Sequence, residues 1–350
     1  MHTLMNSQLI SSPTPSPVHA GLPAKWQLLC LFFLAAFAGS SLGQDRREDW
    51  VFEHEGCRFS AVLDLPSGEG PHPCLVLVPG SGQNKRDGMV AMLGNTPECL
   101  YPDLAGDTLF PYRELAEQLS ARGLAVLRYD ELAHSCPQAL DSLSFSRLWL
   151  PAASAMQQLA KHPAIAGQRL IFLGHSEGGA LLPYLAEAAG NCAGLIGLAA
   201  PYRPLDSLMV WQLREFAQRC PADGSVMREQ AAQIEAYFGV VRRGDFTPPG
   251  FPLGGVHAEL WQTYLMKMDA AGSALRARSE PRLMIGLGND YNVPGEELES
   301  WRKALHGTKS QCLEIPGLTH YLNQNDQPGV DPAIADTILA WLQEQALIKK

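Results

Sequence analysis

Residues 171–179 read IFLGHSEGG, an apolar run that leads into Ser176 among glycines. The apolar run predicts a buried strand, and the helical spacing of 178–189 predicts a helix directly after the serine. In such a strand–turn–helix arrangement, Gly174 and Gly178 lie where a tight turn leaves almost no room for a side chain. The turn is expected to project the hydroxyl at the carboxyl edge of a sheet, where ligands bind. The alternative is a serine that only caps the helix.

A serine hydroxyl is a weak nucleophile at neutral pH and needs a base, together with a group that orients the base. Three histidines follow Ser176 in the chain, His257, His306 and His320. His320 lies in a loop directly after the last predicted strand, from which an imidazole reaches across the sheet edge. We therefore predict His320 as the base. His257 is the alternative, and His306 lies near the end of a predicted helix.

The predicted orienting acid is Asp290. It follows the predicted strand 283–287 and precedes His320 by about thirty residues, in the chain order Ser, Asp, His that this architecture uses. Its expected role is to hold the imidazole tautomer and to stabilise the imidazolium. The rival carboxylates are Glu296 and Glu297, which are expected on a solvated helix face, and Asp326, which is expected in a turn.

A tetrahedral intermediate also needs backbone donors, which form an oxyanion hole. One predicted donor is the N–H of Glu177, the residue after the serine. The other is expected from the loop 79–83, where Ser81 is favoured over Gly82 by its position. Such a donor is typically worth about 3 kcal/mol of transition-state stabilisation.

Strands alternate with helices along the chain, which predicts a mostly parallel sheet flanked by helices. The segment 81–108 shows few periodic features and is interpreted as a long loop. The segment 204–277 is largely helical, with an interruption at 247–252, and is predicted to be a lid over one end of the sheet. The predicted strands are 51–54, 58–65, 74–78, 124–129, 170–173, 195–199, 283–287 and 312–315; the predicted helices are 112–122, 147–161, 178–189 and 332–345. Seven aromatic residues of this segment are candidates for the wall of an acyl pocket, although at helical spacing most are expected to be packing residues and only two or three to contact substrate. They are Trp211, Phe216, Tyr237, Phe238, Phe251, Trp261 and Tyr264.

The chain has 350 residues, of which 46% are hydrophobic and 18% are charged, so it can bury a sizeable core. Its net charge of −9 and the lack of a run rich in lysine and arginine argue against a nucleic-acid partner. The sequence leaves the oligomeric state open.

Residues 1–43 differ in composition from the rest of the chain. Residues 1–24 are rich in serine, proline and threonine and are predicted to be disordered. Lys25, the apolar run 28–38 and the small residues after it match a secretory signal peptide. The run is shorter than the roughly 20 residues that span a bilayer, and a short N-terminal membrane anchor is the alternative. We expect export, a folded domain over 44–350, and no membrane span after processing.

The chain has eight cysteines, and none forms a cluster with zinc spacing, so no metal site is expected. In an exported protein some of them should pair. Cys57 with Cys74, and Cys99 with Cys136, are the suggested pairs.

With these motifs the sequence resembles the α/β-hydrolases over nearly all of 51–347. The residues that carry the resemblance are Pro79-Gly-Ser-Gly82, Arg128-Tyr-Asp130, Gly174-His-Ser-Glu-Gly-Gly179, Gly288-Asn-Asp-Tyr-Asn-Val-Pro294 and Pro316-Gly-Leu-Thr-His320. It is most similar to bacterial serine esterases of the dienelactone-hydrolase-like or prolyl-oligopeptidase-like groups. The resemblance implies acyl transfer from a small-molecule ester by a Ser-His-Asp triad without a cofactor.

One departure from these relatives follows the predicted strand 124–129. They often have an Asp-x-Arg-Gly-x-Gly-like turn there, whereas this chain has Asp130-Glu-Leu-Ala-His-Ser135. Asp130 is expected as a structural hydrogen-bond acceptor, with contact of Asp130 or His134 to the pocket as the alternative. The triad also fits a serine peptidase, a thioesterase or an acyltransferase. A catalytically inactive binding protein is the alternative of another class.

Overall fold

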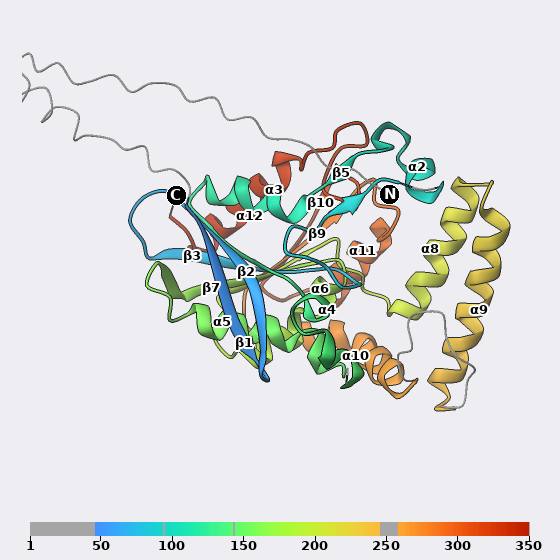
Figure 1. Cartoon of the computed structure of the whole chain (residues 1–350), viewed down its shortest axis with the longest axis horizontal. Coiled ribbons are helices and arrows are strands. Elements are labelled where there is room, and N and C mark those ends of the chain that lie inside the picture. The colour runs from blue at the N-terminus through green and yellow to red at the C-terminus, as the bar shows by residue number, and fades with distance from the viewer. Residues whose placement is uncertain (1–45, 94, 143, 246–257, 350) are drawn as a thin grey trace, which may run out of the picture. The chain divides into compact units, whose positions relative to one another are not determined.

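The computed structural model describes residues 46–93, 95–142, 144–245 and 258–349 (Figure 1). The predicted leader 1–43, the predicted interruption 247–252, Phe251 and His257 lie outside these residues. Among the helices that are described, none has the length and apolar character needed to cross a membrane.

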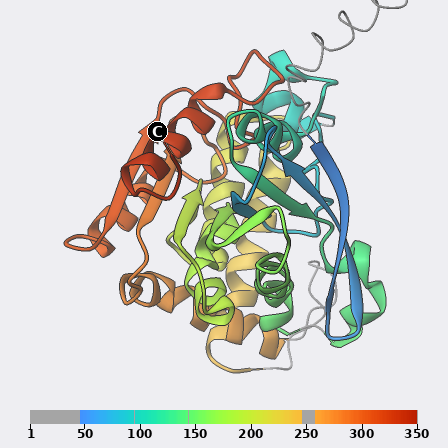
Figure 2. The same ribbon diagram turned by 90° about the vertical axis from the view of Figure 1, so that its left-hand side faces the viewer.

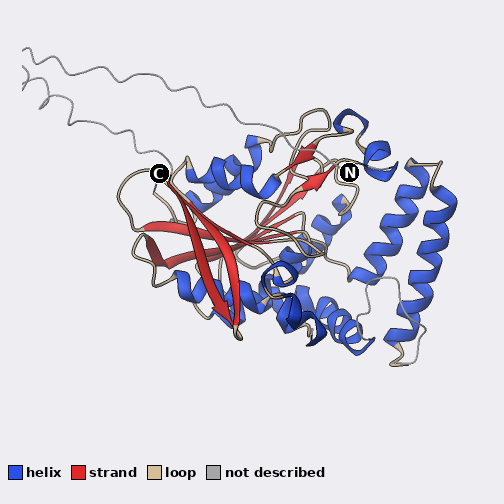
Figure 3. Cartoon of the chain, in the orientation of Figure 1, coloured by secondary structure: helices blue, strands red, loops and turns tan. Residues whose placement is uncertain are grey.

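Eight strands of the described chain form one sheet in the order β1-β2-β6-β3-β7-β8-β9-β10. Strands are drawn in red in Figure 3. β1 pairs antiparallel with β2 at one edge, β2 pairs antiparallel with β6, and the remaining neighbours are parallel. The predicted mostly parallel sheet with an antiparallel pair at its edge is therefore confirmed. The strands are β1 (Arg46–His54), β2 (Cys57–Leu65), β3 (His72–Val78), β6 (Ala125–Tyr129), β7 (Ile165–His175), β8 (Gly194–Leu198), β9 (Arg282–Leu287) and β10 (Ser310–Ile315).

Helices cover both faces of the sheet (Figures 1 and 2). Side chains alternate along a strand, so neighbouring residues of β3 enter different cores. Leu75 and Leu77 pack with α3 (Pro111–Ser120) and α12 (Pro332–Glu344). Val76 and Val78 pack in the opposite core, which is covered by α5 (Leu150–Leu159) and α7 (Leu182–Ala189). Burial on both faces explains why the central strands are continuous apolar runs.

The helix predicted over 178–189 is two helices, α6 (Glu177–Ala180) and α7 (Leu182–Ala189), so the prediction of one continuous helix is wrong. Pro183 is the second residue of α7, and proline has no N–H to donate to the carbonyl four residues earlier. The hydrogen-bond ladder is therefore interrupted at this point.

The segment 81–108 contains short elements, so its interpretation as a featureless loop is wrong. β4 (Val90–Ala91) pairs antiparallel with β5 (Thr108–Leu109), and the chain between them forms α2 (Asn95–Leu100) and the single turn η1 (Pro102–Leu104). Elements this short are too brief to show a sequence period.

Three helices, α8 (Leu205–Arg219), α9 (Gly224–Arg242) and α10 (Ala258–Arg276), occupy the segment predicted to be helical. α8 and α9 lie side by side at one end of the sheet (Figure 1). Arg242 of α9 joins all three, since its guanidinium donates to Asp206 of α8 at 3.0 Å and to Asp269 of α10 at 2.9 Å. The remaining elements are α4 (Leu132–Ser135), η2 (Pro137–Ser142), η3 (Ser146–Leu148) and α11 (Gly295–Ala304).

Two disulfides join Cys57 to Cys136 and Cys99 to Cys220, with Cα atoms 5.6 and 5.8 Å apart. Both suggested pairs are therefore wrong. Cys74 lies on β3, which β6 separates from β2, the strand that Cys57 begins. The second disulfide attaches α2 to the end of α8, a contact between segments that the sequence places far apart.

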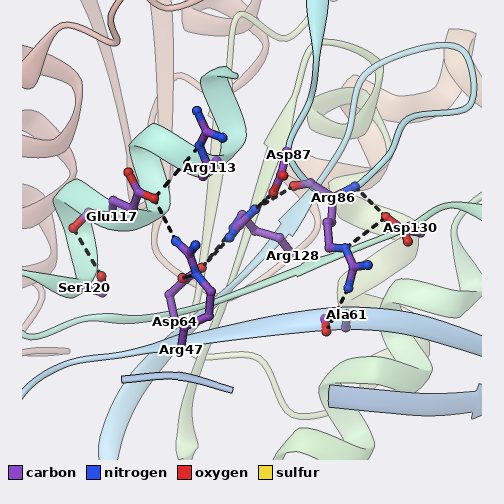
Figure 4. Close-up of polar contacts among 10 residues, drawn as sticks. All are labelled: Arg47, Ala61, Asp64, Arg86, Asp87, Arg113, Glu117, Ser120, Arg128 and Asp130. Carbon is purple, nitrogen blue, oxygen red and sulfur yellow. Dashed lines mark hydrogen bonds and ion pairs between the residues drawn. The ribbon is translucent and has the colours of Figure 1, made fainter. Parts of the chain in front are cut away.

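A buried ion pair joins β2 to β6. Arg128 and Asp64 are 1% and 4% exposed, and the guanidinium Nε donates to Asp64 Oδ2 at 2.9 Å (Figure 4). Loss of Asp64 removes one of the two carboxylate partners of the buried Arg128 guanidinium and leaves it with Asp87 alone.

Asp64→Ala is therefore expected to lower the free energy of unfolding by about 1.5–3 kcal/mol, measured by urea denaturation. Glu53→Ala is the matched control. Glu53 lies in the same hairpin as Asp64 and also pairs with an arginine, Arg58, but both of these side chains are exposed. An Asp64→Ala protein as stable as Glu53→Ala would contradict the assigned role of the pair.

Candidate active site

Ser176 lies at the turn between the end of β7 at His175 and the start of α6 at Glu177. Its φ of 52° and ψ of −123° are a sparsely populated conformation for a residue with a side chain. A Cβ atom at Gly174 would lie 2.1 Å from the carbonyl oxygen of Gly178, so glycine is required there. The predicted absence of room around the serine is confirmed.

Gly178 is restricted in the same way by the strand next to β7. A Cβ atom there would lie 2.5 Å from the carbonyl oxygens of Val78 and Pro79. The helix that carries the serine therefore approaches the end of β3 at backbone distance. This approach is what brings the loop after β3 to the serine.

His320 and Asp290 form a buried pair. The Nδ1–H of His320 donates to Asp290 Oδ2 at 2.7 Å, and the two residues are 9% and 7% exposed. The other carboxylate oxygen, Oδ1, accepts the backbone N–H groups of Asn292 at 2.7 Å and Val293 at 2.8 Å. Asp290 is thus fixed by its own loop, and the Nε2 atom of His320 is left to accept a proton.

The residue before Ser176 brings the serine turn next to the loop of His320. The ring of His175, the residue before Ser176, lies 4.7 Å from the ring of His320 between centroids. No hydrogen bond joins the Ser176 hydroxyl to His320 among the described residues. Such hydrogen bonds are often long in unliganded enzymes and tighten when substrate binds.

The loop after β3 passes directly beside the serine. A Cβ atom at Gly80 would lie 3.0 Å from Ser176 Cβ and 3.5 Å from Ser176 Oγ. The next N–H, that of Ser81, makes no hydrogen bond to another residue that the structure describes. Glu177 begins α6, so its N–H has no acceptor within the helix. The two predicted donors therefore flank Ser176, one in each neighbouring segment.

A buried hydrogen-bonded chain, which the sequence did not reveal, connects these segments. The N–H of Gly80 donates to the Tyr112 hydroxyl at 3.0 Å, and that hydroxyl lies 3.0 Å from His175 Nδ1. On its other side, His175 Nε2 lies 3.1 Å from the backbone carbonyl of His320. Because a carbonyl only accepts, Nε2 carries the proton and Nδ1 accepts from Tyr112.

This series of hydrogen bonds requires the neutral form of the His175 imidazole. Burial lowers the pKa of His175 well below its ordinary value, and the neighbouring His320 lowers it further. The neutral ring therefore joins the serine turn, the loop after β3 and the loop of His320. Tyr112 shows only as the start of a predicted helix in the sequence, and no local pattern distinguishes it.

The turn after β6, where the chain departs from its relatives, holds the loop after β3. Asp130 Oδ1 accepts the N–H of Arg86 at 2.9 Å, which confirms its expected role as a structural acceptor. His134 Nε2 lies 2.9 Å from the carbonyl oxygen of Gln83 in the same loop. The guanidinium of Arg128 donates to the carbonyl of Arg86 at 3.2 Å and also contacts Asp87, the residue after Arg86 (Figure 4).

Glu131 is a buried carboxyl group in this turn, 9% exposed. Its Oε2 atom accepts from the backbone N–H of Asn84 at 2.6 Å and from the Asn84 side chain at 3.0 Å. Burial raises the pKa of Glu131 to about 8, although the hydrogen bonds from Asn84 oppose the shift.

The raised pKa of Glu131 makes the free energy of unfolding decrease as pH rises. Between the ordinary glutamate range and about pH 8, the folded chain keeps a proton on Glu131 that the unfolded chain has released. Stability therefore falls as pH rises through this window, by at most about 1.4 kcal/mol per pH unit. Glu131→Gln is expected to remove this slope and to gain stability relative to the wild type as pH approaches 8. Urea denaturation from pH 5 to 9 measures the difference, and parallel curves would contradict the assignment.

The described part of the helical segment 204–277 makes hydrogen bonds to the site. The Tyr264 hydroxyl of α10 donates to the carboxylate of Glu177. Gln212 of α8 donates to the carbonyl of Asn292 at 2.7 Å, in the loop that holds Asp290. Of the aromatic residues suggested for the pocket, Tyr264 is thus bonded to a site residue.

Other members of that aromatic set pack on each other or on neighbouring side chains. Phe238 and Trp261 meet edge to face with centroids 5.3 Å apart, and the guanidinium of Arg203 lies 5.7 Å from the ring of Trp211. The first contact lies within the helical segment, and the second joins Trp211 to the residue just before the segment.

No protein-family model matches the chain. The chain is 27% identical to the esterase EstD of Thermotoga maritima over 292 residues, which are 80% of this chain and 64% of EstD. It thus spans less than two thirds of that relative.

Solved structures share the fold. Est1E from Butyrivibrio proteoclasticus superposes with a TM-score of 0.52 at 15% identity, covering 86% of this chain and 99% of Est1E. Dienelactone hydrolase from Anabaena variabilis gives a TM-score of 0.51 at 16% identity, over 86% and 98% of the two chains. The chain therefore has the α/β-hydrolase fold, and the predicted resemblance to esterases of that superfamily is confirmed.

Proposed function

We propose that the chain is a serine hydrolase that cleaves carboxylic esters of small molecules through an acyl-enzyme. The observation that carries the proposal is the strained Ser176 turn beside a buried His320–Asp290 pair. The sequence similarity to the esterase EstD supports the same reaction class.

In the proposed reaction, Ser176 Oγ attacks the ester carbonyl carbon while His320 Nε2 takes the hydroxyl proton. The tetrahedral intermediate collapses, the C–O bond to the alcohol breaks, and His320 returns the proton to the leaving alcohol oxygen. Water then attacks the acyl-enzyme by the same route and releases the acid. Asp290 holds the Nδ1–H tautomer throughout, since its Oδ2 accepts that proton at 2.7 Å.

The N–H groups of Ser81 and Glu177 are the proposed donors to the oxyanion. Both belong to backbone that is fixed before substrate binds, so little reorganisation is needed during the reaction. The support is positional: Gly80 lies against Ser176, and Glu177 is its neighbour in the chain.

We also propose that α8, α9 and α10 form the lid of the acyl pocket. The contacts of Tyr264 with Glu177 and of Gln212 with the loop of Asp290 support this role. The disulfide from Cys99 to Cys220 anchors the end of α8 to α2.

Export is part of the proposal. Two disulfides are expected to persist in an oxidising compartment and not in a reducing cytosol. The positively charged residue and the apolar run within 25–38 support a signal peptide, whose cleavage would be read from the N-terminal sequence of exported protein.

Hydrolysis of p-nitrophenyl acetate, butyrate and octanoate by the full chain tests the proposed function. Turnover of at least one ester above the spontaneous rate is expected. The acyl length of the preferred ester then indicates the size of the acyl pocket. A folded protein that hydrolyses none of the three would contradict the general esterase assignment and direct attention to thioesters and peptides.

A further inference from the structure

Gly80 is a point of low intrinsic rigidity in the loop after β3. A Cβ atom there would lie 3.0 Å from Ser176 Cβ, closer than ordinary van der Waals contact. Without a side chain, however, its two backbone dihedrals have the widest freedom of any residue. The peptide unit that follows, from Gly80 to Ser81, contains the N–H that is proposed to bind the oxyanion. Some other group has to fix the direction of that N–H.

Side chains hold the peptide units on both sides of Gly80. The preceding unit is held through its N–H, which donates to the Tyr112 hydroxyl at 3.0 Å. The following unit is held through the Gly80 carbonyl, which accepts from Asn84 Nδ2 at 3.0 Å. The peptide is planar and trans, so the Ser81 N–H points away from that carbonyl. A hydrogen bond to the carbonyl therefore sets the direction of the donor.

Asn84 is itself fixed in one orientation. Its Nδ2 group donates to both the Gly80 carbonyl and Glu131 Oε2, and both neighbours are acceptors. A reversed amide would place its oxygen against two other oxygens, so only one orientation is compatible with the contacts. The backbones add a reciprocal pair, since Asn84 N–H donates to Glu131 Oε2 at 2.6 Å and Glu131 N–H donates to the Asn84 carbonyl at 3.0 Å.

We propose that Asn84, oriented by Glu131, is a positioning residue that aims the Ser81 N–H at the oxyanion. This inference rests on the proposed serine-hydrolase function. Asn84 does not touch the reacting atoms; it acts through the Gly80–Ser81 peptide. The turn after β6, which departs from the pattern of related esterases, thereby supplies a part of the catalytic geometry.

The test compares Asn84→Ala with Gln83→Ala on a p-nitrophenyl ester. Gln83 is the matched control because its side chain also anchors this loop, accepting from Ala133 N–H at 2.8 Å, but does not contact Gly80. Asn84→Ala is expected to lower kcat about 10- to 100-fold with little change in KM, since a displaced donor weakens only the transition state. Gln83→Ala is expected to keep kcat within about twofold, since no oxyanion contact depends on it.

A tetrahedral inhibitor gives a second readout that loop stability alone would not move. A trifluoromethyl ketone forms a hemiketal with the serine, and its oxyanion needs the same donors as the intermediate. Its inhibition constant is expected to rise in Asn84→Ala by about the same factor as kcat falls.

A second route leaves Asn84 in place. Glu131→Ala removes the acceptor that orients the amide and is expected to lower kcat, whereas Glu131→Gln keeps an oxygen acceptor and is expected to restore most of that loss. The comparison of these two Glu131 variants tests the positioning role of Asn84 even if the Asn84→Ala protein does not fold.

The outcomes separate this inference from the proposed function. An inactive wild type would overturn both. An active wild type, an inactive Ser176→Ala, and an Asn84→Ala protein with the kcat and inhibition constant of Gln83→Ala would overturn the positioning role alone.

Discussion

Ser176→Ala is expected to lower kcat for ester hydrolysis about a millionfold while the chain remains folded. The substitution removes the nucleophile, and neither His320 nor the oxyanion donors can replace it, because these groups act on the serine as a unit. The fold should persist because the hydroxyl makes no hydrogen bond to a described residue, so no buried partner is left unsatisfied. Turnover of the preferred p-nitrophenyl ester and thermal unfolding measure the two effects.

Ser300→Ala is the control for Ser176→Ala. Ser300 lies on the solvent side of α11, and its hydroxyl donates only to the carbonyl of Glu296 within the helix. It should retain wild-type kcat. Equal activity of Ser176→Ala and Ser300→Ala would show that Ser176 is not the nucleophile.

Asp290→Asn is expected to lower kcat about ten-thousandfold with a small change in KM. The asparagine oxygen can still accept the N–H groups of Asn292 and Val293, which hold the loop. Its NH₂ group then faces His320 Nδ1, so the imidazole proton moves to Nε2. In that tautomer His320 cannot take the proton of the serine hydroxyl. Steady-state kinetics measure the loss.

Asp336→Asn provides the comparison for Asp290→Asn, since Asp336 is a surface carboxylate on α12 whose partner is Arg122. A tautomer defect should also leave thermal stability nearly unchanged, whereas general damage to the loop would lower it. A kcat loss below tenfold in Asp290→Asn would exclude Asp290 as the orienting acid.

The fold, and the residues that the structure brings together at the candidate site, could be predicted from the sequence because each leaves a local pattern. β3, β7 and β9 each contain a continuous apolar run because both faces of the sheet are buried there. The glycines around Ser176 are required by backbone contacts within a few residues or with the next strand. Asp290 and His320 could be selected because each directly follows a predicted strand, and parallel strands end at one edge.

The links between these segments were not accessible from the sequence. Tyr112 is 32 positions from Gly80 and 63 positions from His175, and its hydroxyl contacts both. The helical pattern around Tyr112 does not indicate that this hydroxyl is buried. Asn84 and Glu131 are likewise 47 positions apart. Partners of this kind are set by tertiary packing, which single-sequence periodicity does not contain.

The disulfides show the same limit. The suggested pairs favoured cysteines that are near in sequence, whereas the observed bonds span 79 and 121 residues. Cysteine positions constrain pairing only through the distance between their Cα atoms, and that distance is a property of the fold.

The most direct test of the account is the site of covalent labelling by a fluorophosphonate ester. The serine of an intact triad attacks phosphorus, fluoride leaves, and a stable phosphonyl-serine forms. Mass spectrometry of the digested full chain should place the adduct on the peptide that contains Ser176, with labelling greatly slowed in His320→Ala. An active protein that carries the adduct on another residue, or that reacts equally fast without His320, would contradict the assignment of Ser176 and His320 as nucleophile and base.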